Sequence, residues 1–172
     1  MSELKNVTIV GSGTTRRITL ERQLEAPIEK VWQAITSIDA LKQWWVDWQD
    51  GGKIEQEEGG RIILGDGSWI NGSIKIWAPP HVFSFTWHES LADPQNTIGY
   101  DEKTKGLLRI DLIEANADQT FLTLIQFLPA ADTVGGAAGW HYFGEILFSY
   151  LKGEKITYRT DRFEELKSLY AR

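Results

Sequence analysis

The clearest pattern of apolar and polar positions in this 172-residue sequence lies near its end, between Gly139 and Gly153. Apolar side chains recur there at helical spacing, which predicts one long helix with an aromatic stripe. The stripe consists of Trp140, Phe143, Leu147 and Leu151, with Phe148 beside it. Gly153 follows Lys152 at a position where helices commonly end on a glycine, and the lysine charge suits the negative end of the helix dipole. Such a stripe needs a broad apolar surface, and we expect the preceding residues to provide it as a curved sheet.

The N-terminal part of the sequence predicts strands and two short helices. Val7–Val10 is compatible with a short edge strand, and the alternation over Arg17–Glu25 predicts a longer strand. Pro27 is expected to open the first helix, because a proline at that position gives up no hydrogen bond. A second helix is expected after Asp39, a residue type that often caps helices. The apolar face of this second helix carries Leu41, Trp44, Trp45 and Trp48.

Beyond Gly51 the period of the pattern becomes strand-like, with Gly and Pro turns between short apolar runs. We expect strands at Lys53–Glu57, Arg61–Leu64, Trp69–Trp77, His81–Glu89, Gly106–Ala115 and Thr120–Leu128. Residues 90–105 are predicted to form a long polar loop. The Gly-rich segment 134–139 is interpreted as a linker or a flexible cavity lid before the long helix. The order of elements predicts an α+β domain with an antiparallel sheet.

The run Thr120–Leu128 is apolar on both faces, which is typical of a strand that is covered on both sides. Leu122 and Leu124 are expected to face the core. Opposite them lie Phe121, Ile125 and Phe127. A last helix, capped by Asp161, would supply the second cover, and a dimer contact is the alternative. That helix would present Phe163, Leu166 and Tyr170 at helical spacing.

Composition narrows the class of protein. The chain has 42% hydrophobic residues and eight tryptophans, which is typical of a globular domain, and its length favours a single one over residues 1–172. It has no cysteine, which excludes disulfides and thiolate metal sites. The net charge of −6 disfavours nucleic acid and anionic membranes as partners. There is no apolar run long enough to span a membrane and no secretory signal pattern at the start, so we expect a cytoplasmic protein.

Five segments of the sequence resemble, in order, the helix-grip superfamily of START-like or SRPBCC proteins. Within it, the sequence is most similar to the family named for the C-terminal domain of the activator of heat shock protein ninety ATPase. The segments are APIEKVWQAIT (26–36), DALKQWW (39–45), EEGGRIIL with GSIKIWAPPHVFSFTW (57–64 and 72–87), TFLTLIQF (120–127) and GWHYFGEILFSYLKG (139–153). The resemblance covers about residues 17–153, and residues 154–172 form an extension that is expected to contain the last helix.

The resemblance implies a curved antiparallel sheet of about seven strands that wraps around the long helix, with two short helices after the first strand. It also implies an apolar cavity between sheet and helix, in which several relatives bind lipids, hormones or polyketides. A small hydrophobic-ligand binding protein is therefore the first expectation. A chaperone-associated protein is the alternative, although the eukaryotic activator has a separate N-terminal domain for which this chain leaves no room. A polyketide-cyclase-like or hydrolase activity is a further alternative.

The candidate ligand-binding residues are those expected to point between the sheet and the long helix. They are Trp44, Trp69, Phe85, Trp87, Ile110, Leu124, Gln126, Trp140, Phe143 and Leu147. Apolar walls with few polar groups are typical of a small-molecule site, and Gln126 would be its polar group. The alternative is that these side chains simply fill a core.

Acid–base and metal chemistry find little support in the sequence. His81, His88 and His141 are scattered and are interpreted as surface residues, so we expect no catalytic residue and a binder rather than an enzyme. No spacing of His, Asp and Glu resembles a metal site, and no cofactor is predicted. The expected partner is a small apolar or aromatic molecule, with a chaperone and a second copy of the chain as alternatives.

Overall fold

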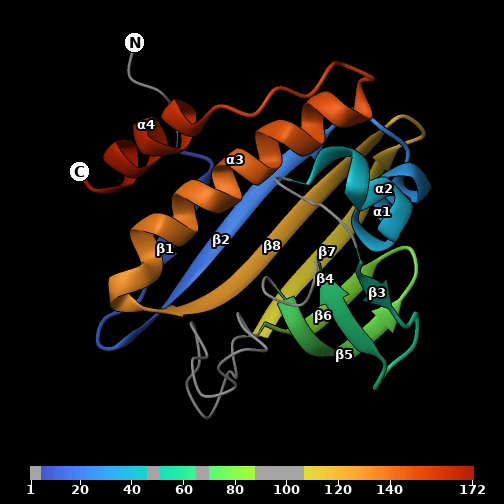
Figure 1. Ribbon diagram of the computed structural model, residues 1–172, viewed down its shortest axis with the longest axis horizontal. Coiled ribbons are helices and arrows are strands. Elements are labelled where there is room, and N and C mark those ends of the chain that lie inside the picture. The colour runs from blue at the N-terminus through green and yellow to red at the C-terminus, as the bar shows by residue number, and fades with distance from the viewer. Residues whose placement is uncertain (1–4, 46–50, 65–69, 88–106) are drawn as a thin grey trace.

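The computed structural model describes residues 5–45, 51–64, 70–87 and 107–172. Its described strands form one antiparallel sheet in the order β1-β2-β8-β7-β6-β5-β4-β3 (Figure 1). The strands are β1 (Val7–Val10), β2 (Thr15–Leu24), β3 (Lys53–Ile54), β4 (Arg61–Leu64), β5 (Ile70–Ala78), β6 (Val82–Thr86), β7 (Leu107–Asn116) and β8 (Gln119–Pro129). The helices are α1 (Ile28–Thr36), α2 (Ile38–Trp44), α3 (Thr133–Leu151) and α4 (Thr160–Tyr170), with the short turn η1 (Ala130–Asp132) before α3.

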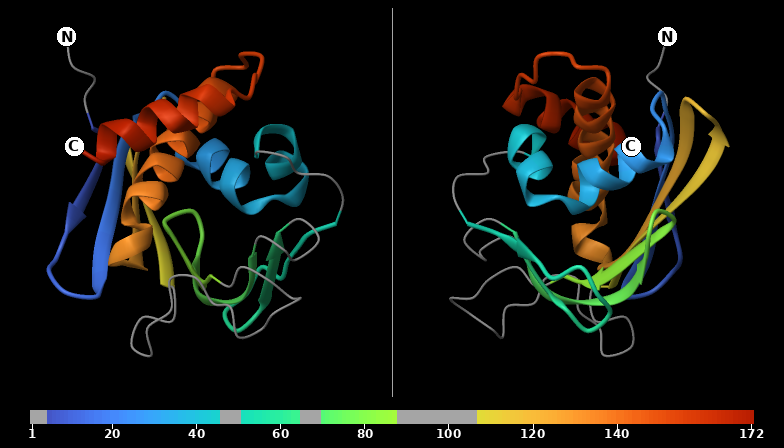
Figure 2. Two further views of the ribbon diagram at one scale, coloured as in Figure 1. Left: turned by 60° about the vertical axis from the view of Figure 1, so that its left-hand side comes forward. Right: turned by 90° about the vertical axis from the view of Figure 1, so that its right-hand side faces the viewer.

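The sheet curves around the helices on one side. α3 lies across β1, β2 and β8, and the strands β3 to β6 turn away and pass beneath α1 and α2 (Figure 2). The inner face carries an alternating set of buried side chains, such as Ile18, Leu20 and Leu24 on β2. The predicted α+β helix-grip architecture is therefore confirmed, with eight strands because the short β1 and the two-residue β3 both pair.

The end of α3 follows the prediction and its beginning does not. Gly153 has a φ of 75° and closes the helix after Leu151, because a glycine tolerates this left-handed conformation. The segment 134–139, interpreted as a linker or lid, belongs to the helix instead, which begins at Thr133. Its glycine at 136 has a packing role, since a side chain there would collide with Leu128 of β8 and crowd Ile18 of β2.

The two short helices follow Leu24 as predicted, with a correction to one cap. α2 begins two residues earlier than expected, because Ser37 is its N-cap and its Oγ accepts a hydrogen bond from the Ala40 N–H at 3.4 Å. Asp39, the predicted cap, lies in the first turn, where its charge suits the positive end of the helix. Trp48, the last predicted member of its apolar face, lies outside the described residues.

The C-terminal helix exists, but it covers a different surface from the one predicted. α4 begins at Thr160, with Asp161 in its first turn, and packs against α3 and not against the outer face of the sheet. Its Leu166 and Tyr170 are buried there. The physical reason lies in α3, which buries side chains on several sides of the helix and needs cover opposite the sheet.

The outer face of β7 and β8 is consequently left exposed. Ile113 and Phe121 are direct cross-strand partners on this face and are 64% and 48% exposed. Farther along β8, Ile125 and Phe127 are half-buried. The prediction that the C-terminal segment covers this face is therefore wrong.

Candidate binding site

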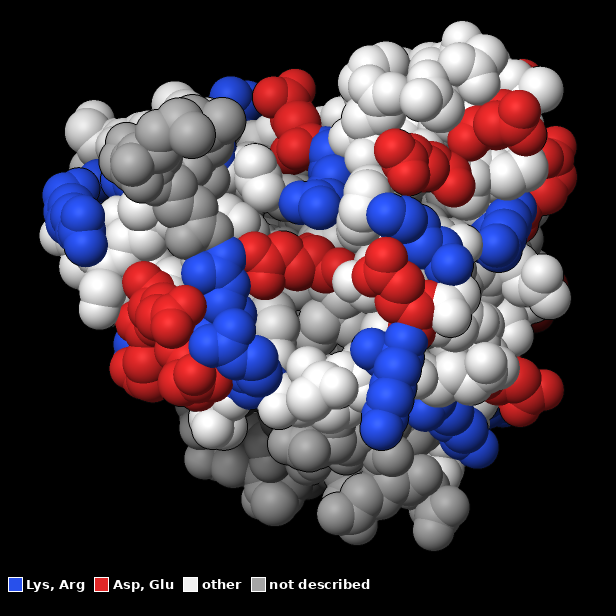
Figure 3. Space-filling view, turned by 90° about the horizontal axis from the view of Figure 1, so that it is seen from above, with Lys and Arg blue, Asp and Glu red and all other residues white. Residues whose placement is uncertain are grey.

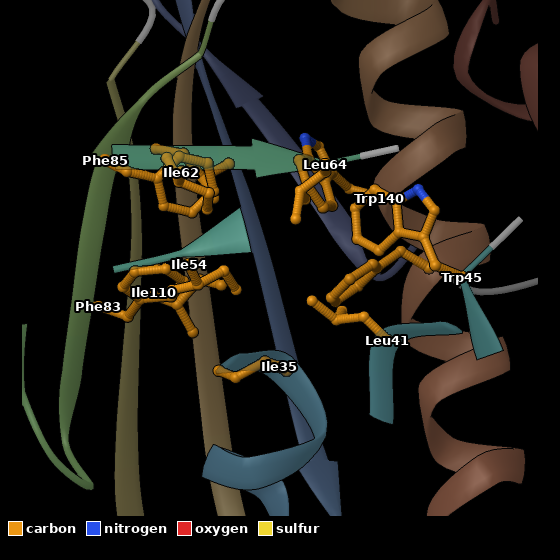
Figure 4. A pocket seen from close by; sticks show the side chains of 12 residues that line it. Ile35, Leu41, Trp45, Ile54, Ile62, Leu64, Phe83, Phe85, Ile110 and Trp140 are labelled. Carbon is orange, nitrogen blue, oxygen red and sulfur yellow. The ribbon is translucent and has the colours of Figure 1, made fainter. Parts of the chain in front are cut away.

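A small hollow lies between the helices and the part of the sheet formed by β3 to β7 (Figure 4). Its volume is about 20 Å³, which is room for about one water molecule. The side chains around it come from α1, the end of α2, the four strands β3, β4, β6 and β7, and α3. They are Ile35, Leu41, Trp45, Ile54, Ile62, Leu64, Phe83, Phe85, Leu108, Ile110, Trp140 and Phe143.

The lining is hydrocarbon apart from two indole nitrogens. One of these is already engaged, because Trp140 Nε1 donates to Gln126 Oε1 at 2.7 Å in a buried hydrogen bond. None of the lining side chains titrates. An apolar molecule would lose nothing by entering such a space, whereas an isolated charge would lose its hydration without gaining a partner.

Aromatic rings form a continuous wall beside this hollow. Phe83 and Phe85 on β6 have ring centroids 4.9 Å apart, and Phe85 is 6.4 Å from Trp87. Trp87 meets Trp140 of α3 at 5.5 Å, and Trp140 meets Phe143 at 5.0 Å. The two pairs that involve Trp140 are edge-to-face, Phe85 and Trp87 are stacked, and aromatic pairs of these kinds stabilise a fold by about 0.5–1.5 kcal/mol each beyond area burial.

The structure brings four of the ten predicted site residues to the hollow. Phe85, Ile110, Trp140 and Phe143 line it. Four others are buried nearby without lining it, namely Trp44, Leu124, Gln126 and Leu147. Trp87 is half-buried beside Trp140, and Trp69 lies outside the described residues. Since the Gln126 carbonyl already accepts from Trp140, it does not serve as a ready acceptor for a ligand.

Eight lining residues are absent from the set predicted from the sequence. Two of them, Phe83 and Leu108, lie on the strands that carry the predicted site residues Phe85 and Ile110. The others are Ile35, Leu41, Trp45, Ile54, Ile62 and Leu64. The alternation of β4, which buries Ile62 and Leu64, contains the signal for one wall. Strand order decides which strands lie against the same helix in a curved sheet. The alternation within a single strand does not reveal that order.

A buried polar cluster lies on the side of α3 that faces α4. His141 is 2% exposed, so its interpretation as a surface residue is wrong. Its Nδ1 is 2.8 Å from Tyr170 Oη, which also accepts from the Val7 N–H at 3.0 Å. Its Nε2 is 3.4 Å from Glu145 Oε1. This cluster joins β1 and α4 to α3 and takes no part in lining the hollow.

The carboxylate of Glu145 is held in its charged form. Burial alone would raise its pKa, but hydrogen bonds and charge from His141 and Arg162 outweigh burial and bring the pKa to about 2. Arg162 Nε donates to Glu145 Oε2 at 3.1 Å. Over the face in Figure 3, acidic and basic side chains interleave without a continuous region of either sign, which is unlike a nucleic-acid-binding surface. In the described part of the chain, no three His, Cys, Asp or Glu side chains group as metal ligands would.

Comparison with known proteins places the fold. The family described as "Activator of Hsp90 ATPase homolog 1-like protein" matches residues 25–152. CalU16 from Micromonospora echinospora is 21% identical, with a TM-score of 0.69 over 96% of this chain and 92% of its own. The Aha1 dimer from Colwellia psychrerythraea is 18% identical, with a TM-score of 0.59 over 78% of this chain and 95% of its own.

A more distant likeness is to an HSP90 activator from Plasmodium falciparum. It is 20% identical, with a TM-score of 0.51 over 66% of this chain and 72% of its own. At these identities the structural likenesses support the fold alone. No protein with a curated description matches the chain. No helix in the described ranges is both long enough and apolar enough to cross a membrane.

Proposed function

Because the chain belongs to the family of Activator of Hsp90 ATPase homolog 1-like proteins, and because a hydrocarbon-lined hollow lies between its sheet and its helices, we propose that it binds a small, uncharged apolar or aromatic molecule there. The observation that carries the proposal is the lining itself. Apolar walls with few polar groups are the usual surroundings of a bound small molecule. The rings of Phe85, Trp140 and Phe143 offer edges and faces to an aromatic ligand.

Binding fits this lining better than catalysis. Acid–base or nucleophilic chemistry needs a titratable or nucleophilic group within hydrogen-bond reach of the reacting atoms. Among the described lining residues there is no such group. A polyketide-cyclase-like or hydrolytic activity therefore has weaker support than ligand binding.

The test compares naphthalene with 2-naphthoate, which has the same rings and one negative charge. Binding is followed through methyl NMR shifts of the isoleucine and leucine side chains. We expect naphthalene to shift the methyl groups of Ile110 and Leu108, and 2-naphthoate to bind at least about tenfold more weakly, because its charge would lose hydration without a partner.

A pair of variants on β7 locates the bound molecule. Ile110→Phe adds a ring inside the hollow, and Ile113→Phe makes the same change on the exposed face of the same strand. We expect Ile110→Phe to lose naphthalene binding and Ile113→Phe to keep it. Equal binding by both variants, or no binding by the unaltered protein, would contradict the proposal.

A second candidate function is contact with an Hsp90 chaperone, and the exposed pair Ile113 and Phe121 supports it. Large apolar side chains that meet on an exposed face often mark a partner surface. The expected result is that micromolar protein stimulates the ATPase of an Hsp90 chaperone and that Phe121→Lys removes this effect while naphthalene binding is kept. A second copy of the chain is the alternative occupant of this face, and sedimentation would detect it. Absence of any ATPase effect would retire the chaperone hypothesis.

A further inference from the structure

Three tryptophans stand around the hollow, and two of them are fixed by hydrogen bonds. Trp44 is buried, and its Nε1 donates to the Ala34 carbonyl at 3.0 Å. Trp140 is buried, and its Nε1 donates to Gln126 Oε1 at 2.7 Å. Each of these rings is therefore tied at its polar end, and rotating either one would leave a buried donor or acceptor without its partner.

Trp45 is held differently. It follows α2 in an extended conformation, with φ −72° and ψ 139°, and is half-buried. Its ring contacts in the described structure are with Trp44, Phe143 and Trp140, at 5.7, 5.6 and 6.5 Å between centroids. No hydrogen bond of its indole nitrogen occurs among the described residues. Its ring can therefore rotate without breaking a hydrogen bond.

Trp45 also stands where the hollow reaches the surface. All lining side chains are buried except Trp45 and Ile54, which are half-buried. These two come from the end of α2 and from the edge strand β3, and Figure 4 shows them on opposite sides of the hollow. Trp45 and Ile54 are therefore the lining side chains that are accessible to solvent.

The hollow as it stands is too small for an organic ligand. Its volume of about 20 Å³ takes about one water, so a ligand needs space that a side chain now occupies. Displacing Trp44 or Trp140 would break a buried hydrogen bond, whereas displacing Trp45 would break ring contacts alone. Of the two tryptophans in the lining, Trp45 is therefore the one whose ring can be displaced without breaking a hydrogen bond.

We infer that Trp45 is the gate of the site and that its ring position sets the size of the ligand. The inference rests on the proposed function. When the indole swings outward, the place it leaves joins the hollow and is bordered by the rings of Phe143 and Trp140. A flat, uncharged aromatic molecule of about two fused rings matches a place that an indole has vacated.

The experiment uses the full chain labelled with 5-fluorotryptophan, with the resonances assigned by single Trp→Phe substitutions. Naphthalene is expected to shift the fluorine signal of Trp45 strongly and that of Trp44 little. Trp45→Ala is expected to speed naphthalene association at least about tenfold and to admit phenanthrene, which the unaltered protein excludes. Trp32→Ala is the matched control, because Trp32 is half-buried in the same region, where it contacts Trp77 and Phe83, but does not line the hollow.

The outcomes separate the gate from the binding function. If the unaltered protein binds naphthalene but Trp45→Ala changes neither the rate nor the size limit relative to Trp32→Ala, the gate is wrong and the binding proposal stands. If Trp45→Ala binds naphthalene while the unaltered protein does not, the Trp45 ring blocks the hollow permanently, which contradicts both the gate and the proposed function. If neither binds any of the probes while both are folded by circular dichroism, the proposed function fails and the gate with it.

Discussion

α3 packs closely against one part of the sheet and is separated from another part by large side chains. Toward β1 and β2 the helix approaches closely: a Cβ placed on Gly144 would lie 3.2 Å from Arg22 Cδ, and one on Gly136 would collide with Leu128. Toward β3 to β7, large rings such as Trp140 and Phe143 stand between helix and strands and leave a hollow. Small residues at one contact and large ones at the other produce a filled core and a binding space around a single helix.

The surroundings of α3 also differ in polarity. On the side that faces α4, a cluster of His141, Glu145 and Tyr170 ties α3 to α4 and β1. The hollow side has hydrocarbon walls and one half-buried ring at its rim. The hydrogen-bonded cluster and the half-buried ring therefore lie in different parts of the molecule. This arrangement suits a protein that keeps its fold while the Trp45 side chain moves.

Removing a ring from the hollow side is expected to have the largest effect. Phe143→Ala should lower the free energy of unfolding by about 3–5 kcal/mol, because buried rings contribute both transfer energy and packing. It should also enlarge the hollow. Urea unfolding measures the first effect and xenon-induced NMR shifts the second. Loss of stability with no added space would show that the walls collapse, which would weaken the contrast between the two sides.

Adding a side chain on the close-packed side is expected to have the next largest effect. Gly136→Val should destabilise the fold by about 1–3 kcal/mol, because the added side chain would displace Leu128 and crowd Ile18. Gly135→Val is the matched control, since a Cβ there meets nothing within 4 Å. Thermal unfolding of the two variants gives the difference directly. Equal melting temperatures would mean that α3 does not rest on β2 and β8 as described.

Acid should lower the free energy of unfolding by a smaller amount, because it weakens the contact between α3 and α4 through Glu145. The folded-state pKa of Glu145 is about 2, below its ordinary 4.5, so its contribution to stability is present above pH 4.5 and is lost as the pH falls toward 2. After solvent screening this contribution is about 1–2 kcal/mol. Urea unfolding at pH 7 and pH 3 measures it. Glu145→Gln should flatten this part of the pH dependence, and Glu114→Gln, at an exposed position on β7, should leave it unchanged.

Much of the fold was readable from local patterns, and the exceptions share a cause. The end of α3 followed from Gly153, and the inner face of β8 followed from alternation. The start of α3 did not, because Gly135 and Gly136 read as flexible residues until Leu128 is known to lie against one of them. The direction in which α4 packs was missed for the same reason, since it depends on what α3 leaves uncovered.

The candidate site shows the same limit at the level of single residues. Trp44 was predicted as a site residue and Trp45 was not, yet Trp45 lines the hollow while Trp44 is buried beside it. This difference between the two tryptophans arises because α2 ends at Trp44. Trp45 has an extended backbone conformation, which turns its ring toward the hollow. His141 was misread because its cover, Tyr170, lies far along the chain. The spacing of apolar residues predicts which face of a helix or strand a residue lies on. It does not predict which distant part of the chain packs against that face.

The bond between the Tyr170 hydroxyl and the Val7 amide has a consequence beyond the domain itself. Val7 belongs to the outermost strand, whose outward amides are the groups that a foreign strand would use to extend the sheet. Tyr170, in the last turn of α4, accepts the hydrogen bond of one of these amides. The helix therefore protects this position of the edge strand from pairing with another chain. A protein shortened before Thr160 would leave the Val7 amide without this partner and open to pairing with a strand from another copy, and self-association through β1 would be the expected result.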